Sequence, residues 1–328
     1  MRLATFIADG TQQLGAVDAS GESICSLQAA AAARSEEHPG TFSRAIAFLH
    51  AGAAAMESAR EVAAWAFQER PEGVLHRLAD VRLAGPVPRP GSLRDTMSFE
   101  RHIIQATRRA IGRLGKLDAL IERRVGTRRS IAGRLNREFY ERPLYYKSNP
   151  RSVVGHDADV RMPAYTKRFD YELEWGVFIG AGGTDIREAA ARDHIAGYTV
   201  FDDFSARDIQ AAEMRGRLGP AKGKDFDTGN AIGPWLVTRD EVVDPYGLKM
   251  TARVNGAEWS RGTTGDMHWS FEEIIAYVSR SETLYPGDFI GSGTVGGGCG
   301  LELGAFLARG DVVELEVEGI GLLRNRVV

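Results

Sequence analysis

Alternation of apolar and polar side chains predicts a strand in the middle of the chain, over residues 169–180. The sequence there is FDYELEWGVFIG, which is apolar and aromatic in its second half and ends in glycine. Successive side chains of a strand point to opposite faces, so Glu172 and Glu174 share one face. The other face carries Tyr171, Leu173 and Trp175. Two adjacent carboxylates beside an apolar run are costly unless a cation lies between them, and a hard divalent ion meets that need. A solvated strand face is the alternative.

The same kind of pattern predicts a chain that is rich in strands. Short apolar runs bounded by turn residues predict strands, and apolar residues at three- and four-residue intervals predict helices. Strands are predicted within residues 3–8, 14–17, 143–150, 195–203, 233–237, 248–255, 284–290, 312–317 and 321–328. Helices are predicted over residues 41–67, 188–194, 204–210 and 270–279.

A stretch rich in proline and glycine divides the chain near residue 86. Residues 85–91 contain three prolines and two glycines, which keep the backbone extended and exclude a helix. A chain of 328 residues exceeds the usual size of one domain. We therefore expect a smaller N-terminal domain over residues 1–85, whose helical stretch over residues 41–67 is structural, and a main domain over residues 86–328.

Candidate chemistry follows soon after this boundary. Ser98, with Arg101 and His102 behind it, looks like a helix start, and Asp95 lies seven residues before His102. If helical geometry extends back to Asp95, the two side chains lie on one helix face, two turns apart. Taken singly, each would more often be a cap or a surface residue.

A second group of polar residues follows the buried strand predicted over residues 195–203. Asp203 ends that strand, and Arg207 and Gln210 follow four and seven residues later in a predicted helix. All three side chains can therefore point the same way. This arrangement is typical of sites that gather one ligand and two donors at a single point.

The segment from residue 108 to 137 is basic and weakly patterned. It contains the pairs Arg108-Arg109, Arg123-Arg124 and Arg128-Arg129. One interpretation is a solvated helical excursion. The other is a mobile lid over an active site, spanning about residues 103–140.

Composition narrows the classes of partner. Hydrophobic residues make up 43% of the chain, enough for a full core, and the formal net charge is −3. This charge gives no electrostatic reason to expect nucleic acid or an anionic membrane as a partner. The two cysteines, Cys25 and Cys299, are too few for a disulfide framework, and no apolar stretch is long enough to cross a bilayer. We expect a cytoplasmic protein.

The glycine-rich segment over residues 291–300 is not expected to bind a nucleotide. It follows a strand, but no helix is predicted after it, and the G-x-G-x-x-G context is missing. Close approach of the backbone to a ligand or to a neighbouring strand is the expected role.

Six short motifs follow one another from about residue 86 to the C-terminus. They are Arg94-Asp95-x-x-x-Phe99-Glu100-x-His102, Asp170-Tyr171-Glu172-Leu173-Glu174, Asp203-Phe204-Ser205-Ala206-Arg207-Asp208-x-Gln210, Gly223-Lys224-Asp225-Phe226-Asp227-Thr228, Tyr285-Pro286-Gly287-Asp288 and Gly291-Ser292-Gly293-Thr294-Val295-Gly296. Together they resemble the fumarylacetoacetate hydrolase family. Six motifs in the family's order are far more specific than any one of them.

The resemblance implies an α+β, β-rich fold, with a catalytic domain of rolled β-sheet (a β-roll) behind a smaller N-terminal α/β domain, and a homodimer. It also implies a divalent metal ion, Mg²⁺ or Mn²⁺ with Ca²⁺ as a further candidate. The implied metal ligands are Asp95, Glu172, Glu174 and Asp203. The implied catalytic residues are His102 as the base that activates water and, as groups that stabilise charge on the substrate, Arg207, Gln210 and Lys224. The implied substrate-binding residues are Tyr146, Lys147 and Thr294.

The expected activity is metal-dependent hydrolysis of a C–C bond in a 2,4-diketo acid, an acylpyruvate-like or fumarylacetoacetate-like small molecule. Two departures from the diketone hydrolases leave alternatives open. The acid that orients the base has no match before Glu302, which falls in an apparent strand, and Met97 stands where those hydrolases carry a tyrosine. The first alternative is a lyase or isomerase of the same fold: an oxaloacetate-type decarboxylase, a hydratase or a 2-oxo-diene-dioate isomerase. The second is a non-enzymatic, metal-stabilised scaffold.

Overall fold

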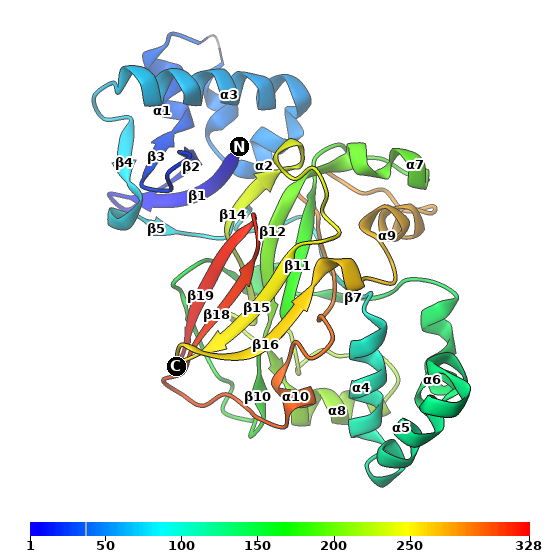
Figure 1. Ribbon diagram of the computed structural model, residues 1–328. Coiled ribbons are helices and arrows are strands. Elements are labelled where there is room, and N and C mark those ends of the chain that lie inside the picture. The colour runs from blue at the N-terminus through cyan, green and yellow to red at the C-terminus, as the bar shows by residue number, and fades with distance from the viewer. Residues whose placement is uncertain (37) are drawn as a thin grey trace.

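The computed structural model describes residues 1–36 and 38–328 as a strand-rich, mixed α/β fold (Figure 1). Its main sheet is open and has 12 strands, ten of them in the order β4-β3-β2-β1-β14-β12-β11-β17-β6-β7, with β5 paired to β1 and β8 to β14. The strands are β1 (Arg2–Ala8), β2 (Thr11–Val17), β3 (Ser23–Ser26), β4 (Leu75–Arg77), β5 (Arg82–Leu83), β6 (Leu93–Met97), β7 (Leu144–Ser148), β8 (Val153–Val154), β11 (Leu173–Ile179), β12 (Ile195–Asp203), β14 (Asn230–Thr238) and β17 (Phe289–Gly291). The predicted β-rich, mixed fold is confirmed.

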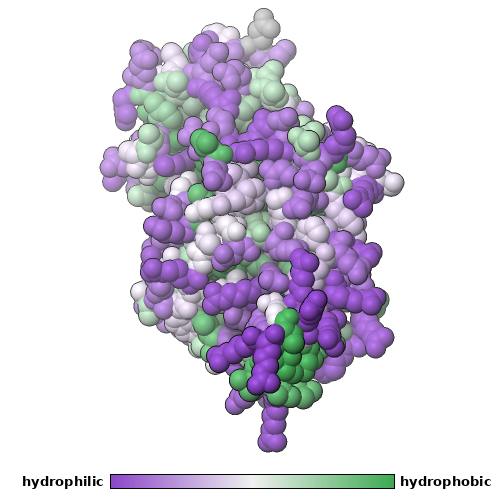
Figure 2. All heavy atoms as spheres, turned by 45° about the vertical axis from the view of Figure 1, so that its right-hand side comes forward, coloured by the Kyte–Doolittle hydropathy of each residue, from purple (hydrophilic) through white to green (hydrophobic). Residues whose placement is uncertain are grey.

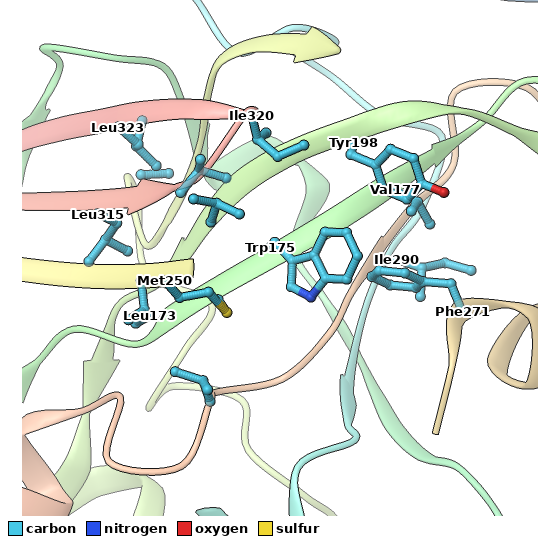
Figure 3. Packing of buried hydrophobic residues seen from close by; sticks show 14 of the residues in the cluster. Leu173, Trp175, Val177, Tyr198, Met250, Phe271, Ile290, Leu315, Ile320 and Leu323 are labelled. Atoms are coloured by element: carbon cyan, nitrogen blue, oxygen red, sulfur yellow. The ribbon is translucent and has the colours of Figure 1, made fainter. Parts of the chain in front are cut away.

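A second sheet packs against the main one, and the largest core lies between them. Its order is β16-β15-β18-β19-β9. The strands are β9 (Asp159–Val160), β15 (Lys249–Val254), β16 (Ala257–Thr263), β18 (Val312–Val317) and β19 (Gly321–Val327). Trp175 of β11 lies at the centre of this core, stacked on Tyr198 at 5.4 Å between ring centroids (Figure 3). Tyr171, Leu173 and Trp175 all belong to the core. This is the apolar strand face that the alternating pattern predicts.

Three helices cover the N-terminal strands (Figure 1). They are α1 (Leu27–Ala33), α2 (Ala45–His50) and α3 (Gly52–Glu69), with 3₁₀ turns η1 (Pro39–Phe42) and η2 (Leu78–Asp80). The single helix predicted over residues 41–67 is therefore wrong. The chain breaks after His50 because Gly52 adopts a positive φ of 75°, which is incompatible with a continuous right-handed helix.

A helical segment projects at the opposite end of the molecule (Figure 1). It comprises α4 (Glu100–Ala110), α5 (Arg113–Val125), η3 (Thr127–Arg129), α6 (Ile131–Leu135) and η4 (Arg137–Tyr140). On α5 the buried side chain is Asp118, which pairs with Arg108 of α4 at 2.7 Å. Large apolar side chains are exposed instead, and a hydrophobic patch is visible at this end of the molecule (Figure 2). The exposed residues are Leu114, Leu117, Leu120, Val125 and Leu135. The helical interpretation is confirmed, and the lid stays a prediction.

Elsewhere in the chain the secondary structure differs from the prediction at three places. The remaining helices and 3₁₀ turns are η5 (Pro150–Ser152), α7 (Glu188–Ala191), η6 (Arg192–His194), α8 (Arg207–Arg215), η7 (Arg239–Glu241), η8 (Thr264–Asp266), α9 (Phe271–Val278) and α10 (Gly300–Leu303). The strand predicted over residues 169–180 is two strands, β10 (Phe169–Asp170) and β11, and β10 pairs with β13 (Ser205–Ala206). Residues 204–210 are therefore part strand and part helix. A helix, α10, does open after the glycine-rich segment.

The main sheet runs across the predicted domain boundary at residue 85. β1 pairs with β14 through Arg2 opposite Val237 and Leu3 opposite Leu236. One hydrophobic cluster also joins side chains of the N-terminal helices to Phe178 and Phe289. The division into two domains stays a prediction. No helix among the described residues combines the length and the apolar character needed to span a bilayer.

Candidate metal and catalytic site

Four acidic side chains converge at one place on the main sheet. Asp95 lies on β6, Glu174 on β11, Asp203 at the end of β12, and Glu172 in the link between β10 and β11. One carboxylate oxygen from each lies within 4.8 Å of the others, and all four side chains are buried. Strand pairing explains the convergence: β11 pairs with β12 on one side and with β17 on the other, and β17 pairs with β6. The four predicted metal ligands are thus brought together.

Asp95 reaches this cluster from a strand. β6 ends at Met97, and α4, which carries His102, begins only at Glu100. The predicted helical relation between Asp95 and His102 is therefore wrong. Pairing of β6 with β7 and β17 keeps residues 93–97 extended, and the Asp95 carboxylate accepts the Gly293 N–H at 3.2 Å.

Two cations lie among the acids. The Lys224 ammonium contacts Glu172 and lies 2.6 Å from Asp203 Oδ2. The Arg207 guanidinium lies 2.8 Å from Glu172 Oε1 and 2.7 Å from Asp170 Oδ2. Burial acts to raise the pKa of Glu172, but the charges of Arg207 and Lys224 together outweigh it and hold that pKa below its ordinary value.

At the other acids the nearby positive charge does not offset burial. Burial, with the Asp203 charge added, raises the pKa of Asp95 to about 8. Burial also raises the pKa of Asp203 to about 6, despite Lys224. Glu174 Oε2 and Asp203 Oδ1 are buried without a hydrogen-bond partner in the described part of the chain. A crowded set of oxygen donors with unused lone pairs fits a hard divalent cation rather than zinc or copper.

Hydroxyl and amide groups surround the acids. The Tyr146 hydroxyl donates to the Asp203 carboxylate. Thr294 Oγ1 donates to Glu174 Oε1 at 3.1 Å. Gln210 lies on α8 three residues after Arg207, and its Oε1 accepts from Arg207 Nη1 at 3.0 Å. The structure therefore places the predicted residues Tyr146 and Thr294 at the carboxylates, and Gln210 beside the Arg207 guanidinium.

Lys147 is the predicted site residue that the structure does not bring to the cluster. On β7 it follows Tyr146, so it points to the opposite face. The register places Tyr146 opposite Asp95 and Lys147 opposite Arg94. The Lys147 side chain is 63% exposed, and its ammonium lies 3.4 Å from Glu282 Oε1.

His102 has a carboxylate partner that the sequence did not reveal. Its Nδ1 lies 3.2 Å from Glu302 Oε2, and both side chains are buried. Glu302 belongs to the short helix α10, so the strand predicted for it is wrong. Both carboxylate oxygens of Glu302 also accept the Gly297 N–H at 3.1 Å, and the Cys299 thiol donates to Oε2 at 3.3 Å. Burial raises the pKa of that thiol.

Asp170 is a second residue whose part in the site was not predicted, although it lies inside one of the quoted motifs. Besides its ion pair with Arg207, it accepts the backbone N–H groups of Gly300 at 2.7 Å and Leu301 at 2.9 Å. It therefore joins the start of α10, which carries Glu302, to the guanidinium beside the acids. The sequence signal for this role was the alternation of Asp170 with Glu172 and Glu174, two residues apart along the chain.

Comparisons with known proteins agree with this architecture. Residues 124–328 match the family model described as fumarylacetoacetate (FAA) hydrolase C-terminal. The human mitochondrial oxaloacetate tautomerase FAHD2A is 41% identical over 187 residues, which are 57% of this chain and 59% of that protein. The match thus spans less than two thirds of the relative's length.

Solved structures match over the whole chain. The fumarylacetoacetate hydrolase of Exiguobacterium antarcticum superposes with a TM-score of 0.71 at 25% identity, over 100% of this chain and 99% of that one. The 2-hydroxyhepta-2,4-diene-1,7-dioate isomerase of Mycobacterium marinum has a TM-score of 0.67 at 23% identity, over 100% of this chain and 98% of that one. At this identity the likeness shows only that the two proteins share a fold. The family model covers well over half of the chain, so this protein belongs to the fumarylacetoacetate hydrolase family.

Proposed function

We propose that the protein is a metal-dependent hydrolase that cleaves a C–C bond in a 2,4-diketo acid of the acylpyruvate type. The observation that carries the proposal is the contact between His102 and Glu302 beside the four carboxylates. A buried carboxylate on one ring nitrogen defines the tautomer of the imidazole and leaves the other nitrogen free to accept a proton. Activation of water requires such a base, whereas a site that only holds a metal ion does not.

The carboxylates of Asp95, Glu172, Glu174 and Asp203 would hold Mg²⁺ or Mn²⁺, with Ca²⁺ as a further candidate. When bound, such an ion acts as a Lewis acid on the oxygens of a diketo acid. Every other contribution comes from side chains of the chain itself.

These contributions follow from the positions of the side chains. Glu302 accepts the Nδ1–H of His102, and Nε2 takes a proton from water. Arg207 and Lys224 supply positive charge where negative charge develops on the substrate. The hydroxyls of Tyr146 and Thr294 orient the substrate, since their hydrogen bonds to carboxylates of the cluster hold them beside the place where it would bind. Hydrolysis adds water across the broken bond, so the proton taken by His102 returns to the carbon that leaves.

A second candidate is an oxo-acid tautomerase or isomerase. The identity to the human oxaloacetate tautomerase, 41% over 57% of this chain, favours it. That chemistry moves a proton between carbon and oxygen of the substrate and consumes no water. The same carboxylates and His102 would serve it, but an activated water molecule would not be needed.

Product analysis separates the two candidates. The full-length protein with Mg²⁺ or Mn²⁺ would be given an acylpyruvate, fumarylacetoacetate and the enol form of oxaloacetate, each in water enriched in ¹⁸O. Hydrolysis is expected to yield two carboxylic acids, one carrying ¹⁸O from water. Conversion of enol to keto oxaloacetate without cleavage of either diketo acid would reject the hydrolase in favour of the tautomerase.

A further inference from the structure

A second cluster of metal-ligating side chains lies next to the carboxylates, since Cys299 forms a β-bridge with Glu172. The cluster consists of His102 on α4, Cys299 just before α10, and Glu302 on α10. They offer one nitrogen, one sulfur and one oxygen, all within 4.8 Å of one another. Nδ1 of His102 lies 3.2 Å from Glu302 Oε2, and Cys299 Sγ lies 3.3 Å from the same oxygen. The residues are 7%, 0% and 7% exposed. None of the three is among the predicted ligands of the divalent metal.

The spacing of these three ligand atoms suits a metal ion with tetrahedral coordination. With metal–nitrogen and metal–oxygen bonds of about 2.0–2.1 Å and a metal–sulfur bond of about 2.3 Å, tetrahedral nitrogen and oxygen ligands lie roughly 3.3–3.4 Å apart, and the sulfur lies roughly 3.5–3.6 Å from either. The nitrogen–oxygen distance of 3.2 Å and the sulfur–oxygen distance of 3.3 Å are shorter than these values by about 0.1 and about 0.2 Å, so small side-chain adjustments would admit an ion. Three protein ligands leave one position for water, as in many zinc sites.

The two clusters differ in the kind of ion that they prefer. The four carboxylates offer only oxygen, which suits Mg²⁺, Mn²⁺ or Ca²⁺. A nitrogen, a sulfur and an oxygen together suit Zn²⁺ or Co²⁺. A thiolate and a carboxylate would balance the charge of such an ion. The nearby Arg207 does not oppose it strongly, because Asp170 and Glu172 already pair with the guanidinium.

We propose that His102, Cys299 and Glu302 form a second metal site that takes Zn²⁺ and thereby inhibits the enzyme. On binding, the thiol proton leaves to solvent, and bonds form from the metal to Sγ, Nδ1 and the carboxylate oxygen. The ring proton moves from Nδ1 to Nε2 by exchange with water, so one proton is released in total and no redox partner is needed.

The inhibitory part rests on the proposed function of His102 as a base. An imidazole that binds a metal through Nδ1 carries its proton on Nε2, so it has no lone pair left to accept a proton from water. Glu302 is occupied at the same time. The metal binding itself does not depend on which reaction the enzyme performs.

The binding test uses Co²⁺ as a coloured substitute for Zn²⁺, added to the full-length protein in excess Mg²⁺. We expect a near-ultraviolet absorption band from sulfur-to-cobalt charge transfer, saturating at one ion per chain and removed by one equivalent of Zn²⁺. Cys299→Ser and Cys299→Ala should lack the band, and His102→Gln should lower the cobalt affinity at least about tenfold because it removes one of three ligands. Cys25→Ser, which changes the other buried cysteine, should keep the band.

Three outcomes of this titration would overturn the site. They are no charge-transfer band up to millimolar Co²⁺, a band that persists in both Cys299 variants, and a band lost in Cys25→Ser with its far-ultraviolet circular dichroism intact. Circular dichroism of both Cys299 variants identifies any that fail to fold, and His102→Gln then tests the site through a different ligand.

The inhibition test measures turnover of the best substrate in millimolar Mg²⁺ with micromolar Zn²⁺. Each variant is compared with its own rate in the absence of zinc. Wild type and Cys25→Ser should lose most of their turnover, and Cys299→Ser should lose little. A charge-transfer band without inhibition would overturn the inhibitory role while leaving the site. A band in a protein that hydrolyses no diketo acid would reject the proposed function alone.

Discussion

The contact between His102 and Glu302 joins side chains 200 residues apart and defines the tautomer of the His102 imidazole. With Nδ1–H directed at a carboxylate, the Nε2 lone pair is the free one. Glu302 is itself held by the Gly297 N–H and the Cys299 thiol. Because three donors hold the Glu302 carboxylate, it keeps its orientation, and it therefore positions the imidazole that acts as the base.

Replacement of His102 by alanine should lower hydrolytic turnover by about 10²–10⁴-fold, the usual contribution of a positioned general base. The content of Mg²⁺ or Mn²⁺ should hardly change, because His102 is not one of the four carboxylate ligands. Steady-state kinetics and elemental analysis would measure the two quantities. His50→Ala, at an exposed position on α2, is the matched control and should leave both unchanged. Near-normal turnover in His102→Ala would contradict the hydrolase.

The carboxylates also predict how stability depends on pH when metal is removed. The pKa values of Asp95, about 8, and Asp203, about 6, lie above the ordinary value of 3.8. Raised carboxyl pKa values mean that the folded state binds more protons than the unfolded state. Their contribution to stability is therefore complete below about pH 4 and is lost as pH rises through 6 to 8.

Urea unfolding in EDTA should accordingly show a lower free energy of unfolding at about pH 8 than at about pH 5.5. Saturating Mg²⁺ should restore more stability at the higher pH, where the acids are ionised and bind the ion. Asp95→Asn should reduce the difference between the two pH values, because it removes the group with the larger shift. An equal effect of Mg²⁺ at both pH values would argue against metal binding by these acids.

At the scale of elements, α5 is held to the molecule mainly through charge. Arg108 of α4 pairs with Asp118 at 2.7 Å and with Glu122 at 2.6 Å, while the leucines of α5 face outward. A helix with few buried apolar contacts opens more readily than one packed on a core. The segment nevertheless lies close to the site, since α4 carries His102, and Arg109 donates to the backbone oxygen of Glu302.

If this segment is a lid, trypsin should cleave the free protein within residues 113–137 and should cleave it more slowly with Mg²⁺ and oxalate bound. Arg108→Ala should accelerate cleavage, because it removes both ion pairs that hold α5. Arg261→Ala, which removes an exposed ion pair on β16, should not. Mass spectrometry of the fragments would locate the cuts. Equal rates with and without the ligand would restore the solvated-surface interpretation.

At the scale of the whole molecule, the N-terminal strands and helices share a core with the sheet that carries the acids. Phe48 and Leu49 of α2 belong to the same hydrophobic cluster as Phe178 of β11 and Phe289 of β17. Two parts that bury each other's apolar surface are expected to unfold together, because separation would expose both sides of the shared core.

Calorimetry of the full chain should therefore show one cooperative transition. Phe48→Ala and Phe289→Ala, on opposite sides of the predicted boundary, should each lower the midpoint of that whole transition, at a cost of about 3–5 kcal/mol for a buried phenylalanine. Two separate transitions, with each substitution moving only one of them, would instead support independent domains over residues 1–85 and 86–328.

The sequence by itself determined the local features of this protein. Alternation of side chains along a strand depends only on backbone geometry, so the acidic and apolar faces around Glu172 and Trp175 were predictable. So were most strands of the main sheet, the helical nature of the basic segment, and the four acids that the motifs place in order. Each depends on a few neighbouring residues or on a family pattern.

Only the tertiary structure decided which distant segments meet. The pairing of β6 with β17 brings Asp95 from a strand to the other acids, and the register with β7 turns Lys147 away from them. The one-turn helix α10 brings Glu302 to His102, although its four residues are too short to show a helical period. Contacts between segments 200 residues apart depend on strand order and packing, which no local pattern encodes.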